Sequence, residues 1–425
     1  AQRKVGVFAA FEHVDHVAGL AQGPADPFGQ FGMVFDEQQA HGIESEQKAG
    51  RGNIDSKRQQ GQSTRRTKMD KPRIRWTLAI LLGLACGSTP AQEPLSRAQR
   101  EGKVVIYANT DQSIVQPLID DFEASHPGIR VEYHDMNSTE LYQRIVAETA
   151  AGTPHADVAW SSAMDLQLKL VNDGYAQPYR SAQTAALPAW ASWKSEAFGT
   201  TYEPAVIVYD RRALSADEAP DTHSALIRLL DDQPERFRHR IASYDPERSG
   251  LGLLLHTQDA QANPTAFWRL AEQMGALGLE RHVSTEDMLD RIAAGKVRIA
   301  YNVLGSYASK RAQQDSALGV IWPRDYTLVL SRVAFIMRDA RNPPAARLWL
   351  DHTLSVHGQA LLVKNLGLFS IRTDNDADTA TAMLRARLSH SFRPIAIGPG
   401  LLAYQDQAKQ RAFLRQWAEA TRSPL

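Results

Sequence analysis

The segment Lys103-Val-Val-Ile-Tyr107 decides the fold, together with the helical pattern that follows it. A short, continuous apolar run of this kind is typical of a strand buried in a parallel sheet. From Ile114 to Phe122 the apolar residues then fall on one face of a helix, which Pro127-Gly128 ends. The alternation repeats with a strand at 129–133, a helix beginning near Asn137, a strand at 157–160 and a helix at 166–171. Strands that alternate with helices predict βαβ units and a parallel sheet.

A second α/β set lies between two long apolar segments, 200–209 and 327–337, each of which we expect to form one strand. The strands of this set are expected at 241–246, 297–302 and 319–322, and helical periodicity returns at 345–354, 359–366 and 407–420. A chain that leaves one lobe, builds another and returns predicts an α/β protein with two lobes joined by paired hinge strands.

The predicted division of the chain follows from this course. Residues 92–205 form the first part of lobe 1, and residues 206–326 form lobe 2. Residues 327–385 return to lobe 1, and residues 386–425 form C-terminal helices that pack on lobe 2.

The N-terminal stretch is expected to lie outside the folded lobes. Residues 1–68 lack a sustained period of either helix or strand, and we interpret them as a non-native, disordered upstream extension. Residues 69–91 have a basic start, a ten-residue apolar run and the small residues Thr89 and Ala91, which is the layout of a cleaved signal peptide. Lipid attachment at Cys86 is the less favoured alternative, because Gly83-Leu-Ala-Cys86 matches the acceptor pattern poorly.

The composition excludes several classes of protein. With 48 Lys+Arg against 48 Asp+Glu among 425 residues, the formal net charge is zero, whereas nucleic-acid binders usually carry a basic excess. A single cysteine excludes a disulfide scaffold and a thiolate metal cluster. Charged residues at 23% and hydrophobic residues at 43% are ordinary for a globular protein.

Small polar residues follow three of the predicted strands. In an open α/β sheet, ligands bind beyond the carboxyl ends of the strands. Each loop also begins a helix, whose first N–H groups are unpaired and carry partial positive charge. The loops therefore predict an anion site, with simple helix capping as the alternative for any one of them. Its candidate residues are Thr110, Ser138, Thr139, Ser161 and Ser162.

Motifs for catalysis and nucleotide binding are missing from the sequence. No Gly-rich dinucleotide loop, P-loop, His-Glu-x-x-His or Gly-x-Ser-x-Gly occurs. His126, His134 and His155 stand alone near predicted element ends, which favours solvated or capping histidines over metal ligands. We therefore expect no enzyme activity, no cofactor and no metal site.

The order of several motifs resembles a known family. After the signal peptide come Glu101-Gly-Lys-Val-Val-Ile-Tyr107, Ala156-Asp-Val-Ala-Trp-Ser161 and Val206-Ile-Val-Tyr-Asp210. Later come Gly295-Lys-Val-Arg-Ile-Ala-Tyr-Asn302 and Trp322-Pro-Arg-Asp-Tyr-Thr327. Together they resemble periplasmic solute-binding proteins of ABC importers, in the branch that includes binders of ferric iron and of phosphorylated or phosphonate solutes.

The resemblance implies a two-lobed periplasmic protein, expected to be a monomer, that closes on one solute and delivers it to a membrane permease. Ferric binders of this branch use neighbouring tyrosines, for which this chain offers only Tyr301 and Tyr307. Small hydroxyls at helix starts favour an organic anion instead, with Arg324 or Arg332 as a further charge. Ferric iron remains the alternative ligand, and a secreted enzyme or sensor partner on the same fold is the third reading. The residues that the resemblance implies for lobe 2 are Ser249, Gly250, Tyr301, Asn302 and Ser306.

Overall fold

The computed structural model describes residues 92–366, 368–374 and 390–422. All of them belong to one compact unit, Gly83–Leu425. The predicted extension at 1–68 and the predicted signal peptide at 69–91 lie outside the described residues, as does Cys86. Among the helices of the described part, none combines the length and the apolar character that a membrane span requires.

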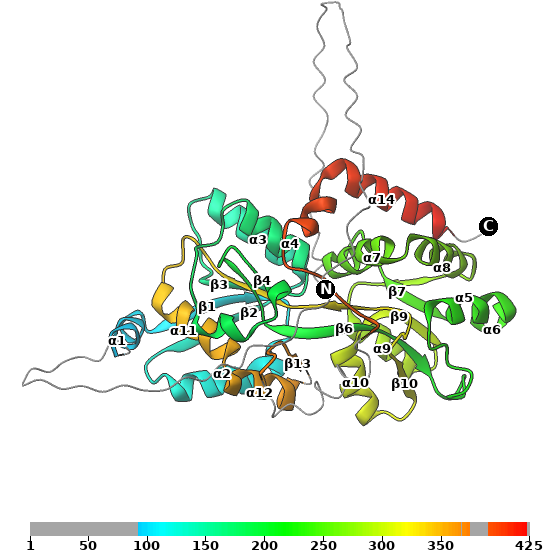
Figure 1. Ribbon diagram of the computed structural model, residues 1–425, viewed down its shortest axis with the longest axis horizontal. Helices are drawn as coiled ribbons and strands as arrows, with labels where there is room; N and C mark the ends of the chain where they lie inside the picture. Colours follow the sequence, from blue (N-terminus) through cyan, green and yellow to red (C-terminus); the bar gives the residue numbers. More distant parts are fainter. Residues whose placement is uncertain (1–91, 367, 375–389, 423–425) are drawn as a thin grey trace, which may run out of the picture. The chain divides into compact units, whose positions relative to one another are not determined.

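The first lobe is built on a six-stranded mixed sheet in the order β2-β1-β3-β12-β5-β4 (Figure 1). β1 pairs in parallel with both β2 and β3, so the carboxyl ends of these three strands share one edge of the sheet. The strands are β1 (Lys103–Ala108), β2 (Arg130–Asp135), β3 (Val158–Ser161), β4 (Ser192–Trp193), β5 (Ala197–Gly199) and β12 (Val333–Ile336). The helices are α1 (Gln92–Glu101), α2 (Gln112–Ser125), α3 (Ser138–Ala150), α4 (Met164–Asn172), η1 (Ala182–Ala186), η2 (Ala189–Ala191), α11 (Pro343–Leu354) and α12 (Val356–Leu366).

The second lobe is built on an eight-stranded mixed sheet in the order β14-β11-β6-β9-β7-β8, in which β10 and β13 also pair with β6. Its strands are β6 (Thr201–Asp210), β7 (Ile241–Tyr244), β8 (Glu280–His282), β9 (Ile299–Leu304), β10 (Leu318–Ile321), β11 (Thr327–Leu330), β13 (Phe369–Ser370) and β14 (Phe392–Pro394). Its helices are α5 (His223–Asp232), α6 (Pro234–Phe237), α7 (Gly250–Ala262), α8 (Pro264–Ala276), α9 (Thr285–Ala293), α10 (Gly305–Gln314), η3 (Pro399–Gln405) and α14 (Gln407–Ala420). The predicted class, two mixed sheets flanked by helices, is confirmed.

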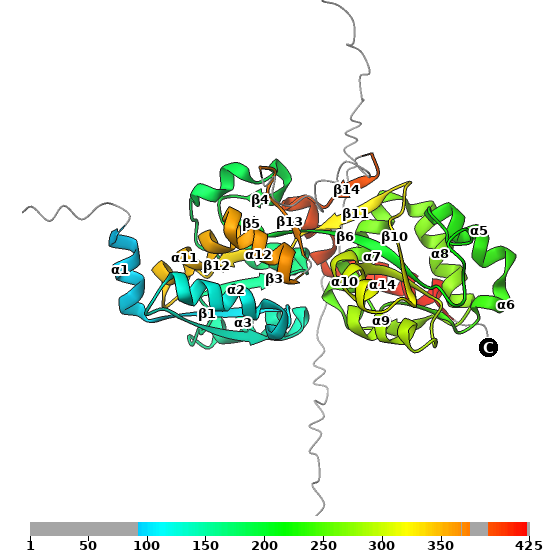
Figure 2. The same ribbon diagram turned by 90° about the horizontal axis from the view of Figure 1, so that it is seen from below.

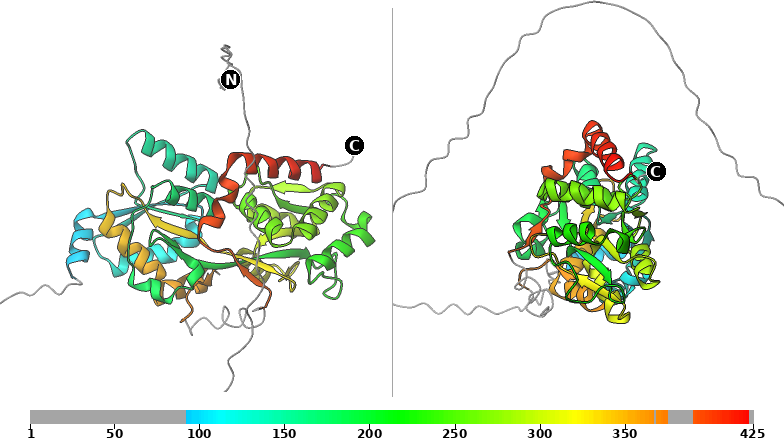
Figure 3. Two further views of the ribbon diagram at one scale, coloured as in Figure 1. Left: turned by 45° about the horizontal axis from the view of Figure 1, so that its top comes forward. Right: turned by 90° about the vertical axis from the view of Figure 1, so that its right-hand side faces the viewer.

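Each lobe has an apolar cluster of its own, and a third cluster joins apolar residues of both lobes. In the first lobe, Phe122 of α2 meets Trp349 of α11 edge to face, with ring centroids 5.2 Å apart. In the second lobe, α14 brings Trp417 against Phe267 of α8 and against the buried His256 of α7. Figure 3 shows α14 lying across α7 and α8. Trp349 and Trp417 both come late in the chain of 425 residues, so the C-terminal helices complete cores that earlier segments begin.

The predicted strand at 327–337 is two strands, because the chain changes sheets within it. β11 pairs antiparallel with β6, whereas β12 pairs antiparallel with β3 and β5. Ser331 and Arg332 lie between them, so the predicted return to lobe 1 at residue 327 precedes the actual crossing. A run of apolar residues predicts that the segment is buried, but it does not indicate in which sheet. Here the first half of the run is buried in one sheet and the second half in the other.

The chain passes between the sheets a second time, at residues 199–201 between β5 and β6. These two crossing segments, residues 199–201 and 331–332, bind each other. The Thr200 amide donates to the Arg332 carbonyl at 2.9 Å, and the Arg332 amide donates to Thr201 Oγ1 at 2.8 Å. Figure 2 shows β6 and β11 running between the two groups of helices. The crossing segments thus form a narrow, hydrogen-bonded connection between the lobes.

The C-terminal elements contact both lobes. η3 packs against α4, and Gln405 Nε2 donates to Asp165 Oδ2 at 2.8 Å. α14 packs against α8. Residues 386–389 and 423–425 of the predicted C-terminal part lie outside the described residues.

Candidate functional site

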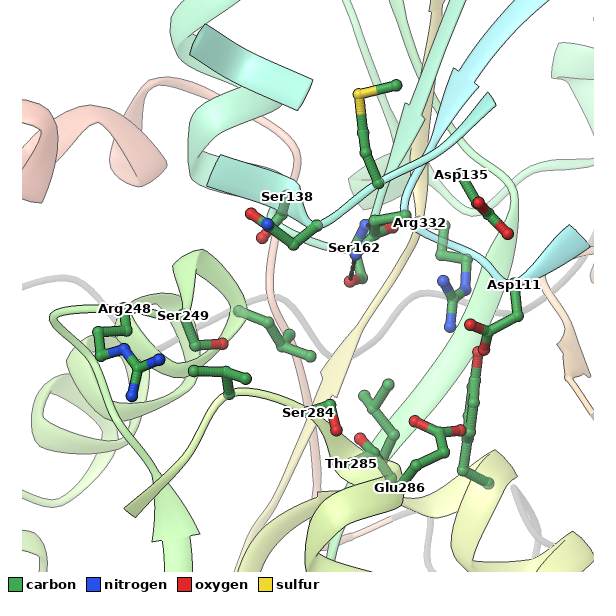
Figure 4. Close-up of a pocket in the computed structure, with 17 residues that line it drawn as sticks. Asp111, Asp135, Ser138, Ser162, Arg248, Ser249, Ser284, Thr285, Glu286 and Arg332 are labelled. Atoms are coloured by element: carbon green, nitrogen blue, oxygen red, sulfur yellow. Dashed lines mark hydrogen bonds between the residues drawn. The ribbon is translucent and has the colours of Figure 1, made fainter. Parts of the chain in front are cut away.

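A cavity of about 480 Å³ lies between the lobes, beside the crossing segments (Figure 4). The first lobe lines it with the loops at the carboxyl ends of β1, β2 and β3, as the sequence predicts for a ligand site in an α/β sheet. The second lobe lines it mainly with the starts of α7, α9 and α10. First-lobe lining residues are Asn109, Asp111, Asp135, Met136, Asn137, Ser138 and Ser162. The others are Arg248, Ser249, Leu251, Val283, Ser284, Thr285, Glu286, Leu304, Tyr307 and Arg332.

Three helices begin at the cavity, each with a side-chain cap. Asn137 Oδ1 accepts from the Glu140 amide at 2.9 Å at the start of α3. Ser249 Oγ and Ser284 Oγ accept from the third amide of α7 and α9, each at 3.1 Å. A cap satisfies one of the four unpaired N–H groups of a helix and leaves others available. The cavity is therefore bordered by the positive ends of these three capped helices, of which α7 alone has no acidic residue in its first turn.

The hydroxyls of Ser138 and Ser162 are available on the first-lobe side. Ser162 Oγ accepts from Asn109 Nδ2 at 2.7 Å, which leaves the hydroxyl proton free to be donated. Ser138 is 7% exposed, and among the described residues its hydroxyl has no hydrogen-bond partner. Both side chains lie at the cavity in Figure 4.

A buried ion pair lies at the inner end of the cavity, beside the crossing segments. Arg332 and Glu203 are 1% and 0% exposed, and Arg332 Nε lies 3.0 Å from Glu203 Oε1 in an ion-pair contact that is not aligned as a hydrogen bond. Arg332 Nη1 donates to Thr110 Oγ1 at 2.6 Å, and Ser306 Oγ donates to Glu203 Oε2 at 3.0 Å. Thr110 and Ser306, both predicted to bind the solute, therefore bind this ion pair.

Three carboxylates, from Asp111, Asp135 and Glu286, also line the cavity. Asp135 Oδ2 accepts from the Gln112 amide at 3.0 Å. The side chain of Glu286 remains exposed in the cavity, but partial burial among the cavity walls raises its pKa to about 7, and the negative charge of Asp111 adds to the rise. No pattern in the sequence singled out Asp111 or Glu286 as residues of a binding site.

The structure brings three of the ten predicted anion-binding residues to the cavity, Ser138, Ser162 and Ser249, together with the alternative residue Tyr307. Thr139 lies in the first turn of α3 but does not line the cavity. Ser161 Oγ accepts from the Ala163 amide at 3.2 Å. Gly250 lies where the lobes touch, since a Cβ there would be 2.8 Å from Leu166 Cδ1.

Tyr301 and Asn302 lie away from the cavity, because β9 continues to Leu304 and does not end at residue 302. The Tyr301 hydroxyl donates to Asp259 in the core of the second lobe. Asn302 Nδ2 donates to Asp259 Oδ2 at 3.0 Å. The structure therefore does not join Tyr301 and Tyr307 in one site.

Of the two arginines that the sequence suggested, only Arg332 reaches the cavity. Arg324 is exposed and pairs with Asp221 at 3.1 Å. The sequence could have predicted that a helix begins at α9, because Ser284-Thr-Glu-Asp287 has a capping residue followed by an acidic residue three positions later.

Comparisons with known proteins agree with this architecture. Residues 117–385 match the family described as bacterial extracellular solute-binding protein. The crystal structure of a substrate-binding protein of an ABC transporter from Agrobacterium tumefaciens is 36% identical, with a TM-score of 0.71, and the match covers 75% of this chain and 94% of that one. Curated protein sequences give no match.

More distant structures share the fold alone. Iron-bound HitA from Pseudomonas aeruginosa is 15% identical, with a TM-score of 0.61 over 75% of this chain and 99% of that one. The periplasmic binding protein P5PA is 15% identical, with a TM-score of 0.60 over 76% of this chain and 100% of that one. The chain thus belongs to the bacterial extracellular solute-binding proteins, the periplasmic substrate-binding components that work with the membrane permeases of ABC transporters.

Proposed function

We propose that this protein captures a small organic anion, such as a phosphate ester, a phosphonate or a carboxylate, in the cavity between its lobes. The supporting observation is that three helix starts border the cavity beside the free hydroxyl of Ser138. Helix N-termini and hydroxyl donors bind anions without a dedicated lysine or arginine. The protein then delivers the anion to its permease as a monomer, after export directed by residues 69–91.

Ferric iron, the alternative ligand, has weaker support. Iron-bound HitA, which is 15% identical, is too distant to carry its ligand to this chain. Burial raises the pKa of both Tyr301 and Tyr307, which opposes the tyrosinate form that ferric iron needs. The third reading, an enzyme or sensor partner, has no supporting observation here, since family and fold are those of transport proteins.

A thermal-shift panel on residues 92–425 tests the proposal. It compares phosphate esters, phosphonates, carboxylates, inorganic phosphate and ferric iron with and without citrate. A ligand at about 100 times its Kd adds roughly 2.7 kcal/mol to stability, so an organic anion that binds is expected to raise the melting temperature by several degrees. Stabilisation by ferric iron alone would contradict the proposal.

Ser162→Ala is expected to weaken binding of the anion found in that panel by roughly 1.5–3 kcal/mol, the usual value of a hydrogen bond to a charged group. Isothermal titration calorimetry measures the change in Kd. Ser161→Ala is the matched control, because that neighbouring hydroxyl is equally buried but binds the Ala163 amide and does not line the cavity. Equal affinities in the Ser162→Ala protein and the wild type would remove Ser162 from the site.

A further inference from the structure

The two ends of the cavity differ in their chemistry. Ser138, Ser249 and Arg248 lie toward one end, whereas Asp111 and Glu286 lie at the other (Figure 4). The first end offers hydrogen-bond donors and positive charge. The second end offers the carboxylates of Asp111 and Glu286, one from each lobe, besides Asp135, which accepts from the Gln112 amide.

The donor end lacks an acceptor. Among the described residues, the Arg248 guanidinium forms no ion pair and the Ser138 hydroxyl forms no hydrogen bond, although the Ser138 side chain is only 7% exposed. A nearly buried donor without a partner costs free energy that a ligand acceptor recovers.

The carboxylate end lacks a cation. In the described part of the chain, neither Asp111 nor Glu286 is in an ion pair, and neither carboxylate has a hydrogen bond to another side chain. Their charges act on each other, since Asp111 helps to raise the pKa of Glu286. Arg332 attracts Glu286 and so lowers its pKa in part, but the same guanidinium is paired with Glu203 at 3.0 Å. Two like charges carried by opposite lobes oppose closure unless a positive group lies between them.

We propose that the solute is zwitterionic, with an anionic group held at the starts of α3 and α7 and a protonated amine held between Asp111 and Glu286. The chemical class is an aminoalkyl phosphate, phosphonate or carboxylate. This inference rests on the proposed function and adds the amine to it. Binding of the amine replaces the repulsion between Asp111 and Glu286 with attraction from both lobes, which couples the cation to closure.

The test compares pairs of probes that differ only in the amine. These are phosphoethanolamine against ethyl phosphate, 3-aminopropylphosphonate against propylphosphonate, and 4-aminobutyrate against butyrate, measured by calorimetry at slightly alkaline pH. In at least one pair we expect the amino compound to bind more tightly by a factor of about 10 or more, as for a charged hydrogen bond. Asp111→Asn and Glu286→Gln should each remove most of this advantage. Asp287→Asn is the control, because it removes a charge from the same turn but not from the cavity wall.

The outcomes separate the two proposals. If the compounds without an amine bind as tightly as their partners, the zwitterion inference is overturned and the anion function stands. If no member of any pair binds to the folded protein, the proposed function fails and the inference fails with it. A diamine, 1,4-diaminobutane, that binds as tightly as the amino compounds would overturn the anionic end.

An independent cluster lies outside the cavity, on the first lobe. Glu132 and His134 are two positions apart in β2 and therefore share a face of the sheet. His155 joins them from the loop before β3, so that ligand atoms of all three residues lie within 4.8 Å of one another. Glu132 Oε1 is 3.0 Å from His134 Nε2 and 3.4 Å from His155 Nε2. The predicted isolation of His134 and His155 is thus wrong, because parallel pairing around β1 brings them together.

Hydrogen bonds from Tyr107 and Lys103 orient this cluster. His155 Nδ1 lies 3.2 Å from the Tyr107 hydroxyl, which donates to Glu148 at 2.8 Å. Lys103 holds the other oxygen of Glu132 at 2.8 Å. Metal-binding histidines usually have their second ring nitrogen fixed in this way. We infer that Glu132, His134 and His155 bind a transition-metal ion, with Zn²⁺ the best match to a His₂Glu donor set.

Calorimetry with Zn²⁺ and Mg²⁺ on protein without a histidine tag tests this site. One equivalent of Zn²⁺ should bind, and Mg²⁺ should not, because imidazole ligands favour Zn²⁺. His134→Ala and His155→Ala should each abolish the Zn²⁺ signal. His357→Ala is the control, because it removes an exposed imidazole that pairs with Asp121 elsewhere on the lobe. Zn²⁺ binding that survives in the His134→Ala/His155→Ala protein, or no binding by the wild type, would overturn the assignment.

Discussion

Glu203→Gln should lower the free energy of unfolding by about 3–5 kcal/mol, because it leaves the buried Arg332 guanidinium without its counter-charge. Both side chains of the pair are essentially inaccessible to solvent, at 0% and 1% exposed. The substitution keeps the shape of the side chain but turns one acceptor oxygen into an NH2 donor, so the loss reports the missing charge together with one lost acceptor. Denaturant unfolding followed by circular dichroism measures it.

Glu218→Gln is the matched control for this prediction. Glu218 pairs with Arg236 at 2.7 Å, but its side chain is 42% exposed, and exposed pairs contribute about 0–1 kcal/mol. Glu203→Leu combined with Arg332→Met should recover much of the stability, since apolar side chains often replace a buried ion pair without loss. A loss below about 1 kcal/mol in the Glu203→Gln protein would show that the buried charge tolerates isolation, contrary to the expectation for buried ion pairs.

Acidification should destabilise the protein through His256. Burial in the second-lobe core lowers the pKa of His256 to about 4, from an ordinary value of 6.5. The unfolded chain therefore binds the proton first, so stability is complete above about pH 6.5 and is lost as the pH falls toward 4. With about 1.4 kcal/mol for each tenfold difference in proton affinity, the loss approaches about 3 kcal/mol below pH 4.

His256→Gln isolates this contribution. Glutamine does not titrate and retains an N–H donor for the Tyr244 carbonyl, from which His256 Nε2 lies 3.2 Å. The difference in unfolding free energy between wild type and variant should shrink between neutral and acidic pH. His352, whose pKa burial also lowers to about 4, titrates in both proteins and cancels in the comparison. His357→Gln is the control, because it removes an exposed histidine. If the difference in unfolding free energy between wild type and His256→Gln did not change with pH, the prediction would be contradicted.

Much of the fold was predictable from the sequence, because the spacing of apolar residues along the chain is a local property that identifies helices and strands. The alternation from Lys103 to Asn172 follows from apolar spacing and from turn residues such as Pro127-Gly128. The crossing at Ser331-Arg332 was not predicted, because the apolar residues on both sides of it are buried in different sheets. An arginine within an apolar run was the local signal of that change.

The site was only partly predictable, for a related reason. Ser138, Ser162 and Ser249 precede or begin helices at strand ends, and that local position carries them to the cavity. Tyr301 and Asn302 do not reach it, because their strand continues two residues further than expected. Asp111 and Glu286 become a pair only when two lobes meet, which no local pattern reports.

The buried ion pair at the crossing segments is a point at which both lobes are held together. Arg332 holds Thr110 of the first lobe, and Glu203 holds Ser306 of the second, so both lobes are fastened at this point. If one lobe rotates about this point, the displacement of a residue grows with its distance from the ion pair. A closing rotation about this point would therefore move Tyr307, whose ring centre is 5.7 Å from Arg332 Cζ, only a little, and would move Arg248 on the opposite side of the cavity further (Figure 4). The length of the solute would then set the angle at which the two lobes stop closing.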